Sequence, residues 1–578
     1  MKIFYHGQGS WDSSTPAGLA SEPNLLALSG NNWDDYETKT TLNACLYFEG
    51  ERLDFDFHIK VLIEGCSYTA EILNEMKSCD WDGFFPIPSA NYISLPSDIE
   101  FYSIIVSKLG DEKALEVVRS LRDAGFLKNV SKEEAVEELL KSTGFFQSLL
   151  RESGAIKAYE DGWRIFDESL DDVEIHDFDL NVLSRENESI PVPFRFSSNL
   201  LPYDINVLVG PNGVGKSHAI KSLTEYWLKT ESGDPKVLEK IGHEPFSRYP
   251  NFSNLILVSY SPFEDFKLDL EKDKDLKDKD AYKYFGFRRI DKGCGPEVGA
   301  QETVELEIVD RDLPSINSAE SVVKALYDDE TLGFITGRVN KLELMLETLN
   351  HGFNVDFVAL KVADISKLGI HGFSVKVIDG VSYLPLFPYI AKTLEKSQLQ
   401  AACDLKGGVV FLYQDTLCSL SSGQKLFSYI VINVLGELRK NSLVVVDEPE
   451  LFLHPTLEIA FVSLLKKVLE PFKSKAVLAT HSLSVVREVP SQCVHIFKDG
   501  AFGLDIVSPP FETFGGNVQR ISAYVFGDKS VTKPFDEWLE IMVKSNPNAE
   551  ELIVKLGDEI NEQLIMKIHR LARMYHGS

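Results

Sequence analysis

The feature that most constrains the fold is a glycine-rich turn between a buried strand and a helix. Residues 210–217 read G-P-N-G-V-G-K-S and fit the pattern G-x-x-x-x-G-K-S. The apolar run Ile205–Val209 precedes the turn, as expected of a strand buried on both faces of a parallel sheet. A helical spacing of Ala219, Ile220 and Leu223 follows it. Glycines let backbone N–H groups approach phosphate oxygens, and a helix start adds its positive dipole end. The turn therefore predicts a phosphate-binding loop in an α/β fold.

The residues of this loop predict contacts with ATP and Mg²⁺. Lys216 is expected to bridge the β- and γ-phosphates, and the hydroxyl of Ser217 to ligate the metal. The side chain of His218 is expected to pack on the helix or lie half-exposed, and not to act as a ligand. The expected nucleotide-binding segment comprises Gly210, Pro211, Asn212, Gly213, Val214, Gly215, Lys216, Ser217 and His218.

A second apolar strand ends in acidic residues. Residues 442–450 read S-L-V-V-V-D-E-P-E, which places Asp447 and Glu448 at the strand end. Carboxylates at the end of an apolar strand are costly unless they meet a cation, and nucleotide-bound Mg²⁺ supplies one. Because adjacent side chains on a strand point in different directions, Asp447 is expected to hold the metal and Glu448 to act as general base on the attacking water. Glu450 is expected only to cap the following turn.

Two further polar segments also predict contacts with anionic groups. The strand Ala476–Thr480 ends at His481, which is expected to contact the γ-phosphate and report its presence. The segment Leu420-Ser421-Ser422-Gly423-Gln424 precedes an apolar helix, where Ser421, Ser422, Gly423 and Gln424 would present another anion site at a helix start.

Bulk properties narrow the class of protein. Lys plus Arg number 59 against 88 Asp plus Glu, so the formal net charge is −29, which argues against a protein coated in nucleic acid. Local basic patches around Lys466 and Lys567 are expected to be solvated helix faces. The seven cysteines form no C-x-x-C pair, which fits a reducing compartment. With no signal-peptide or membrane-span pattern, the expected location is cytoplasmic, away from any membrane.

The pattern along the chain predicts an α/β sheet interrupted by an insertion. We expect an N-terminal α+β domain over 1–172, without a chemical motif, and a helical C-terminal region over 516–578. The sheet-forming head is expected over 173–264 and 401–515. Between its two parts, residues 265–400 are expected to form a mainly helical inserted region that opens with the exposed, charge-dense stretch 271–280.

Taken together and in this order, the four elements resemble the ABC ATPase superfamily. The correspondence is Walker A at 210–217, the signature at 420–424, Walker B ending at Asp447-Glu448, and the switch histidine His481. It covers roughly 176–264 and 401–515. The resemblance implies ATP hydrolysis by heads that stack head-to-tail as a homodimer or higher oligomer. The Ser421 loop of one protomer would then close on the ATP held by Lys216 of the other.

One subgroup is closer than the transporter heads. Asp-Glu-Pro-Glu-x-x-Leu-His-Pro at 447–455 is similar to ATPases of the overcoming-lysogenisation-defect group. With an added N-terminal domain, no fused nuclease and the stretch 512–516, the chain resembles most the Septu-type antiphage ATPases, the PtuA family. That resemblance implies an ATPase without nuclease activity of its own, which regulates an HNH-type nuclease partner in antiphage defence, with DNA or a retron RNA–DNA as a further partner.

Other functions stay open at this point. A RecF- or SMC-like ATPase of DNA repair or chromosome maintenance is the main alternative, although no heptad pattern predicts a long coiled coil. A transporter nucleotide-binding subunit fits less well, because of the large N-terminal domain and the Leu453-His454-Pro455 turn. The glutamine that usually follows the strand after Walker A is also absent from Leu255–Pro262, where Ser261 offers a weak substitute.

Overall fold

The computed structural model describes two compact units, Met1–Gly515 and Gly516–Ser578. Residues outside the description are 8–21, 32, 34–37, 54, 56, 167–173, 199, 271–280, 293–304, 333–339, 369–374, 452, 454, 501–502, 527–533 and 577–578. The charge-dense stretch 271–280, Cys294 and His454 therefore lie outside the described residues. Within the described part of the chain, we find no helix whose length and apolar character would let it cross a bilayer.

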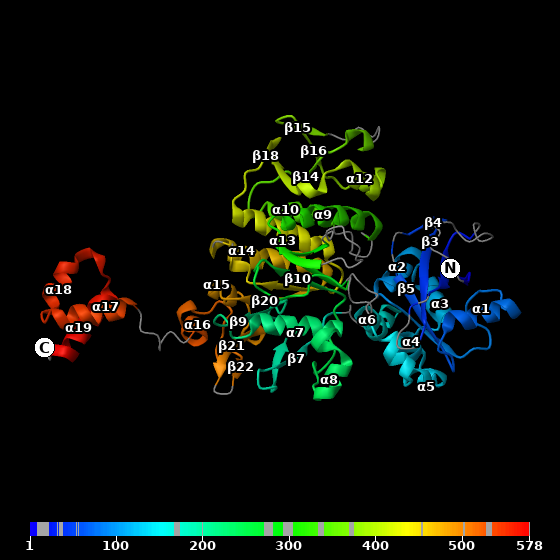
Figure 1. Cartoon of the computed structure of the whole chain (residues 1–578), viewed down its shortest axis with the longest axis horizontal. Coiled ribbons are helices and arrows are strands. Elements are labelled where there is room, and N and C mark those ends of the chain that lie inside the picture. The colour runs from blue at the N-terminus through cyan, green and yellow to red at the C-terminus, as the bar shows by residue number, and fades with distance from the viewer. Residues whose placement is uncertain are drawn as a thin grey trace, which may run out of the picture. The chain divides into compact units, whose positions relative to one another are not determined.

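The N-terminal part of the first unit is a six-stranded sheet with helices packed against it (Figure 1). The sheet has the order β1-β2-β3-β5-β6, with β4 paired to β3, and only β1 and β2 run parallel. Its strands are β1 (Lys2–Tyr5), β2 (Leu25–Gly30), β3 (Thr41–Phe48), β4 (Glu51–Arg52), β5 (Phe57–Ile63) and β6 (Tyr92–Pro96). Its helices are α1 (Thr69–Cys79), α2 (Glu100–Leu109), α3 (Asp111–Leu121), α4 (Ala124–Phe126), α5 (Glu137–Leu140) and α6 (Ser153–Asp161). Buried side chains from Ile3 to Tyr159 form one core, so this part of the chain has an α+β arrangement.

A seven-stranded sheet forms the centre of the first unit. Its order is β11-β10-β19-β20-β9-β21-β22, parallel throughout except for the antiparallel β21–β22 hairpin. The strands are β9 (Ile205–Val209), β10 (Leu255–Ser259), β11 (Tyr282–Gly286), β19 (Leu443–Asp447), β20 (Lys475–Thr480), β21 (Val494–Gly500) and β22 (Gly503–Val507). β9, β10, β19 and β20 are buried at every position, which explains why their sequences are mostly apolar.

Elements on both faces bury this sheet (Figure 1). On one face lie α7 (Lys216–Leu228) and the antiparallel hairpin of β7 (Phe178–Leu183) and β8 (Ser189–Phe194), which share a core with alternate residues of the strands. On the other face lie α13 (Ser422–Glu437) and α14 (Pro455–Leu469). Short helices α8 (Pro235–Ile241) and α15 (Leu483–Val486) complete the head. The α/β P-loop fold expected from the sequence fits this arrangement.

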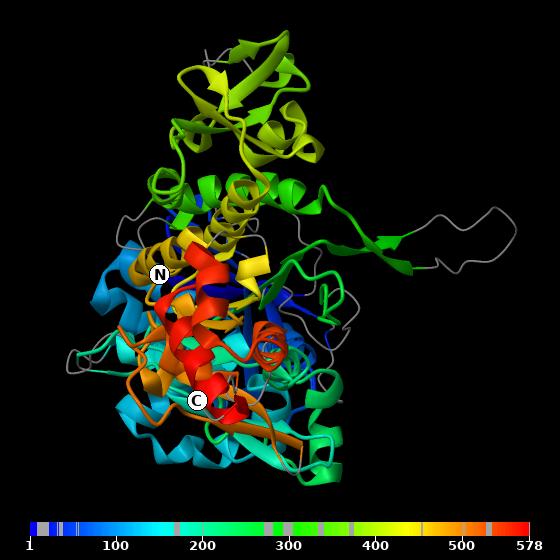
Figure 2. The same ribbon diagram turned by 90° about the vertical axis from the view of Figure 1, so that its left-hand side faces the viewer.

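The region between the two parts of the head is mixed. A two-stranded ribbon of β12 (Arg288–Lys292) and β13 (Glu305–Val309) extends from the unit, and it is clearest as the projecting green ribbon of Figure 2. A five-stranded sheet follows in the order β15-β16-β14-β17-β18. The strands are β14 (Phe357–Lys361), β15 (Lys376–Ile378), β16 (Val381–Pro385), β17 (Val409–Tyr413) and β18 (Thr416–Leu417). The helices are α9 (Leu313–Leu332), α10 (Lys341–Leu349), α11 (Ile390–Thr393) and α12 (Lys396–Ala402).

This region differs from the mainly helical insertion expected over 265–400. β11 pairs in parallel with β10 as the edge strand of the head sheet, so the head continues past 264. At the other end, β17 and β18 belong to the small sheet, which extends past 400 to Leu417. The strands are only two to five residues long, and such short runs carry too little alternation to be distinguished from helix ends.

The phosphate-loop helix also meets the N-terminal part of its unit. Lys229 caps the end of α7 in a left-handed conformation (φ 57°) and donates to the carbonyl oxygen of Leu150 at 3.2 Å. Arg439 and Asp98 form an ion pair at 3.2 Å between the same two parts. These contacts join the N-terminal sheet to the head without reaching the phosphate loop itself.

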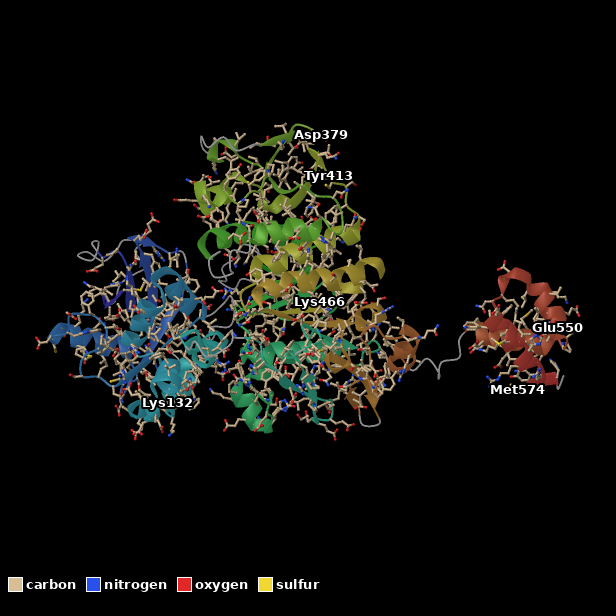
Figure 3. The ribbon with its side chains drawn as sticks, turned by 180° about the vertical axis from the view of Figure 1, so that it is seen from behind. Lys132, Asp379, Tyr413, Lys466, Glu550 and Met574 are labelled. Atoms are coloured by element: carbon tan, nitrogen blue, oxygen red, sulfur yellow. The ribbon has the colours of Figure 1, made fainter. Side chains whose placement is uncertain are left out.

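The second unit is helical, and three of its four described helices share a core. Its helices are α16 (Val518–Val525), α17 (Pro534–Ser545), α18 (Ala549–Leu556) and α19 (Glu562–His576). Leu539, Val543, Leu552 and Ile568 are the innermost residues of its core. Figure 3 labels Glu550 on α18 and Met574 on α19, which mark this unit.

The contact between α13 and α9 gives a test of this packing. A Cβ atom at Gly436 of α13 would lie 2.6 Å from Cβ and 2.8 Å from the carbonyl oxygen of Ser321 on α9. Gly436→Val should therefore lower the free energy of unfolding by about 1–3 kcal/mol through overpacking. The matched control, Glu320→Val, adds the same side chain at an exposed position of α9 and should change it by less than about 0.5 kcal/mol. Equal stability of the two variants in denaturant titrations would contradict this packing.

Candidate functional site

The phosphate-loop sequence forms the turn between β9 and α7. Gly210 lies against β21, where an added Cβ would come within 2.3 Å of the carbonyl oxygen of Phe497. Gly213 and Gly215 adopt φ angles of 79° and 104°, which favour glycine. The glycines are therefore required by the backbone path, and α7 starts directly after them at Lys216.

Lys216 lies inside this loop. Its side chain is 5% exposed, and Nζ donates to the carbonyl oxygens of Gly210 and Pro211 at 3.1 Å each. Burial lowers the pKa of Lys216, while the carboxylates of Glu448 and Asp447 oppose that shift. The loop thus holds a desolvated cation beside acidic groups, an environment in which charge interactions are stronger than in water.

Asp447 meets two hydroxyl groups from neighbouring elements. Its Oδ1 accepts from Ser217 Oγ at 3.5 Å, and its Oδ2 accepts from Ser259 Oγ at 3.3 Å. Burial, together with the nearby carboxylates of Glu264 and Glu448, raises the pKa of Asp447 to about 8. Because the charged form of Asp447 is disfavoured, this carboxylate needs a cation beside it to stay ionised.

These groups fit Mg²⁺, which prefers oxygen ligands and binds through one or two carboxylates plus substrate phosphates. Ser217 and Asp447 are the residues that would hold the metal, with Ser259 orienting the carboxylate. The sequence pointed to Ser261 in place of the absent glutamine. Ser261 is buried and lines the cavity, but Ser259 is the hydroxyl that reaches Asp447.

Glu448 and His481 face each other across the ends of β19 and β20. Glu448 has a φ of 49°, and its backbone N–H donates to Ala479 O at 2.8 Å. His481 Nε2 lies 3.3 Å from Glu448 Oε1 and 3.1 Å from Lys216 Nζ. The hydrogen bond with His481 lowers the pKa of Glu448, so this carboxylate is favoured in its proton-accepting form.

His481 Nε2 cannot hydrogen-bond both Lys216 and Glu448 in the same protonation state. Nε2 must lack a proton to accept from Lys216, and it must carry one to donate to Glu448. The two hydrogen bonds are therefore alternatives. A shift of Lys216 toward a phosphate would free His481 to bond Glu448.

A cavity of about 1130 Å³ opens over the phosphate loop. Asn212 to His218 line one side, with His218 exposed and its Nε2 3.2 Å from Leu183 O. Glu448, Ser261 and Glu264 line another. Two hairpins add residues that sequence reasoning missed: Ser184, Arg185 and Asn187 from the β7–β8 turn, and Asp499, Gly503 and Leu504 from β21 and β22. No sequence pattern marks these residues, because only the topology of the fold brings them close to the phosphate loop.

The signature residues lie elsewhere. Ser421 caps α13, accepting from the N–H of Gln424, whose side chain accepts from the N–H of Ser421 in return. Ser421 and Ser422 are exposed, and Gly423 and Gln424 are half-buried. Among the described residues that line the cavity, none comes from 421–424. The chain thus brings together Walker A, Walker B and His481, and leaves the signature apart.

The candidate basic patches are paired with acids. Lys467 bonds Glu347 at 3.0 Å and Lys475 bonds Asp204 at 2.8 Å. In the second unit, Lys567 pairs with Asp536. The sequence predicted solvated helix faces here, and the side chains of Lys467 and Lys567 are 41% and 39% exposed.

Comparison with known proteins gives one family match. The model described as "AAA domain, putative AbiEii toxin, Type IV TA system" matches residues 387–487, which contain the signature, Asp447, Glu448 and His481. This match supports a P-loop ATPase of the ABC/SMC type. It implies nucleotide use and, as is usual for such ATPases, Mg²⁺.

Two individual proteins are similar to this chain, with sequence identities of 24% and 12%. "Protein ea59" of Escherichia phage lambda is 24% identical over 557 residues, covering 94% of this chain and 93% of that protein. The solved structure of Stu0660 of Streptococcus thermophilus is 12% identical and covers 58% of this chain and 76% of that one, with a TM-score of 0.26. A score that low carries no argument about the fold.

The geometry of Lys216 predicts its role in nucleotide binding. Lys216→Ala removes the buried cation and should abolish binding of a fluorescent ATP analogue, measured by anisotropy. Lys221→Ala is the matched control, because Lys221 lies on the same helix but pairs with Asp265 at 2.8 Å outside the cavity lining. Normal binding by the Lys216 variant would remove the phosphate-loop assignment.

The Asp447 contacts predict a metal-dependence effect. Asp447→Asn keeps the side-chain size but loses the charge, so the Mg²⁺ concentration for half-maximal ATP turnover should rise about tenfold or more. Ser259→Ala should produce a smaller rise in the same titration, since it removes only the orienting hydroxyl. An unchanged Mg²⁺ dependence in the Asp447 variant would show that the metal binds elsewhere.

Proposed function

We propose that this chain binds and hydrolyses ATP in head-to-tail dimers, and that its nucleotide state controls a partner nuclease in antiphage defence. The proposed dimer rests on the position of the signature residues 421–424. Ser421 stands exposed at the start of the 16-residue helix α13, outside the cavity that contains Lys216. A helix N-terminus attracts anions, so the signature of a second protomer is suited to close on the phosphates.

Within one protomer, each site residue has a defined task in hydrolysis. Lys216 binds and orients the terminal phosphates, and Ser217 and Asp447 hold Mg²⁺. When bound, the metal neutralises charge that develops on the phosphate oxygens. Glu448 accepts a proton from the attacking water, and its lowered pKa keeps it able to do so. His481 lies between Lys216 and Glu448 and responds to the γ-phosphate.

The name of the matched family motivates the proposed defence setting. The matched family carries the name of an AbiEii toxin and a type IV toxin–antitoxin system. The protein of phage lambda, which is 24% identical to this chain, comes from a phage genome. We infer that the ATPase head does not cut nucleic acid itself and instead regulates a nuclease that is active only in one nucleotide state.

Mixing two inactive variants tests the composite site. Lys216→Ala and Ser421→Arg should each lack turnover, because one loses the phosphate contact and the other blocks closure of the signature. Mixed in equal amounts, they should regain up to about a quarter of wild-type turnover, because half of randomly formed dimers are heterodimers with one intact site each. Lack of any recovery, with heterodimers present by native mass spectrometry, would contradict head-to-tail closure.

Glu448→Gln provides a second readout of closure. This variant should bind ATP, hydrolyse it slowly and accumulate as a dimer on a sizing column, since ATP favours the closed state through contacts that the open state lacks.

The proposed control of a partner nuclease is tested by DNA cleavage. The purified chain alone should not cut DNA, whereas the complex that it forms in its host should. DNA cleavage by the chain alone would contradict this part of the proposal.

A further inference from the structure

Glu450 makes a contact that the roles described above do not explain. It follows the general base in the short 3₁₀ turn Pro449–Leu451. Its Oε1 accepts the backbone N–H of His481. The backbone N–H of Glu448 in turn donates to Ala479 O at 2.8 Å. The turn after β19 is therefore fastened to the end of β20 on both sides of Thr480.

The surroundings of Glu450 indicate that this contact is its purpose. Burial raises the pKa of Glu450, and the backbone N–H of His481 and the hydroxyl of Thr480 act against that rise. A buried carboxyl group is costly unless it is hydrogen-bonded. Oε1 of Glu450 accepts from the His481 amide, whereas its buried Oε2 has no hydrogen-bond partner among the described residues. Glu450 does not line the nucleotide cavity. It is therefore placed to act through His481 and not on the nucleotide.

The ring of His481 has little positional tolerance. Its Nε2 is 3.1 Å from Lys216 Nζ and 3.3 Å from Glu448 Oε1, and hydrogen bonds weaken strongly beyond about 3.5 Å. A backbone shift of a few tenths of an ångström would break one contact. A shift of about 1 Å would break both, and misplacements of that size can cost about a hundredfold in rate.

We propose that Glu450 is a positioning residue for ATP hydrolysis, which fixes the backbone of His481 so that its ring stays between Lys216 and Glu448. This inference rests on the proposed ATPase function. The function it assigns to Glu450 needs a hydrogen-bond acceptor, not a negative charge. That requirement separates it from a second general base, which needs an ionisable group.

Two substitutions separate these roles. Glu450→Gln keeps an acceptor oxygen in place and removes the charge. Glu450→Met keeps nearly the same volume and removes the acceptor, and Glu450→Ala repeats that loss if the methionine variant does not fold. Asp123→Ala serves as a control for general destabilisation. Asp123 is a buried acid that caps α4 in the N-terminal part, away from the nucleotide cavity.

The first measurement is amide hydrogen exchange of the segment 476–486 in the nucleotide-free chain. The His481 amide should exchange slowly in the wild type and in Glu450→Gln, and clearly faster in Glu450→Met, because its acceptor is lost. Asp123→Ala should leave this segment unchanged. Slow exchange in Glu450→Met would overturn the proposal, whatever the chain does to ATP.

The second measurement is steady-state ATP turnover. In Glu450→Met, kcat should fall about 10–100-fold, with little change in KM for ATP, while Glu450→Gln should stay close to wild type. A loss in Glu450→Gln as large as in Glu450→Met would show that the charge matters and overturn the positioning role. Normal kcat in Glu450→Met would overturn it too. Absence of turnover in the wild type would instead count against the proposed ATPase, and the exchange result would still decide the contact.

Discussion

The site depends on one electrostatic constraint, the crowding of carboxylates around a single buried lysine. Asp447, Glu448, Glu450 and Glu264 all act on Lys216 through charge. Burial raises the pKa of Asp447 to about 8, and the nearby carboxylates of Glu264 and Glu448 add to that rise. The arrangement is therefore relieved by an added cation. A nucleotide bound with Mg²⁺ would supply that cation, and its phosphates would be held by Lys216.

The sheet order creates this crowding. Walker A follows β9, Walker B ends β19, and His481 follows β20, while β20 lies between β9 and β19 in the sheet. Because these strands run parallel, their carboxyl ends meet at one edge. Residues far apart in the sequence thereby come within hydrogen-bond distance, as Lys216 and His481 do at 3.1 Å. The β10 strand adds Ser259 in register with Asp447.

Much of this edge could be predicted from the sequence, because its strands are recognisable as mainly apolar runs. Ile205–Val209, Leu443–Asp447 and Lys475–Thr480 are mostly apolar, and polar residues lie at or just after their ends, so the sequence predicts the order of loop, acids and histidine. Ser259 was not, since its partner is known only once β10 and β19 are paired. Glu450 looked like a turn cap, and only the fold shows that its acceptor meets the His481 amide.

The insertion was harder to predict for a different reason. Its strands are short, and β11 pairs with β10 in the head sheet and not with the small sheet that follows it in the sequence. Periodicity reports which face of an element is buried, not which sheet the element joins. The cavity residues of the β7–β8 turn and of strands β21 and β22 show the same limit, because they carry no motif and lie at the phosphate loop only through the topology.

We propose that Lys216 of one protomer and Ser421 of another enclose the same ATP. The most direct measurement is the structure of Glu448→Gln with ATP and Mg²⁺ by cryo-electron microscopy. We predict a dimer in which the γ-phosphate contacts Lys216 of one protomer and the signature turn of its partner, with Asp447 at the metal. ATP bound at Lys216 in a chain whose signature faces solvent, with no second protomer over it, would contradict the account.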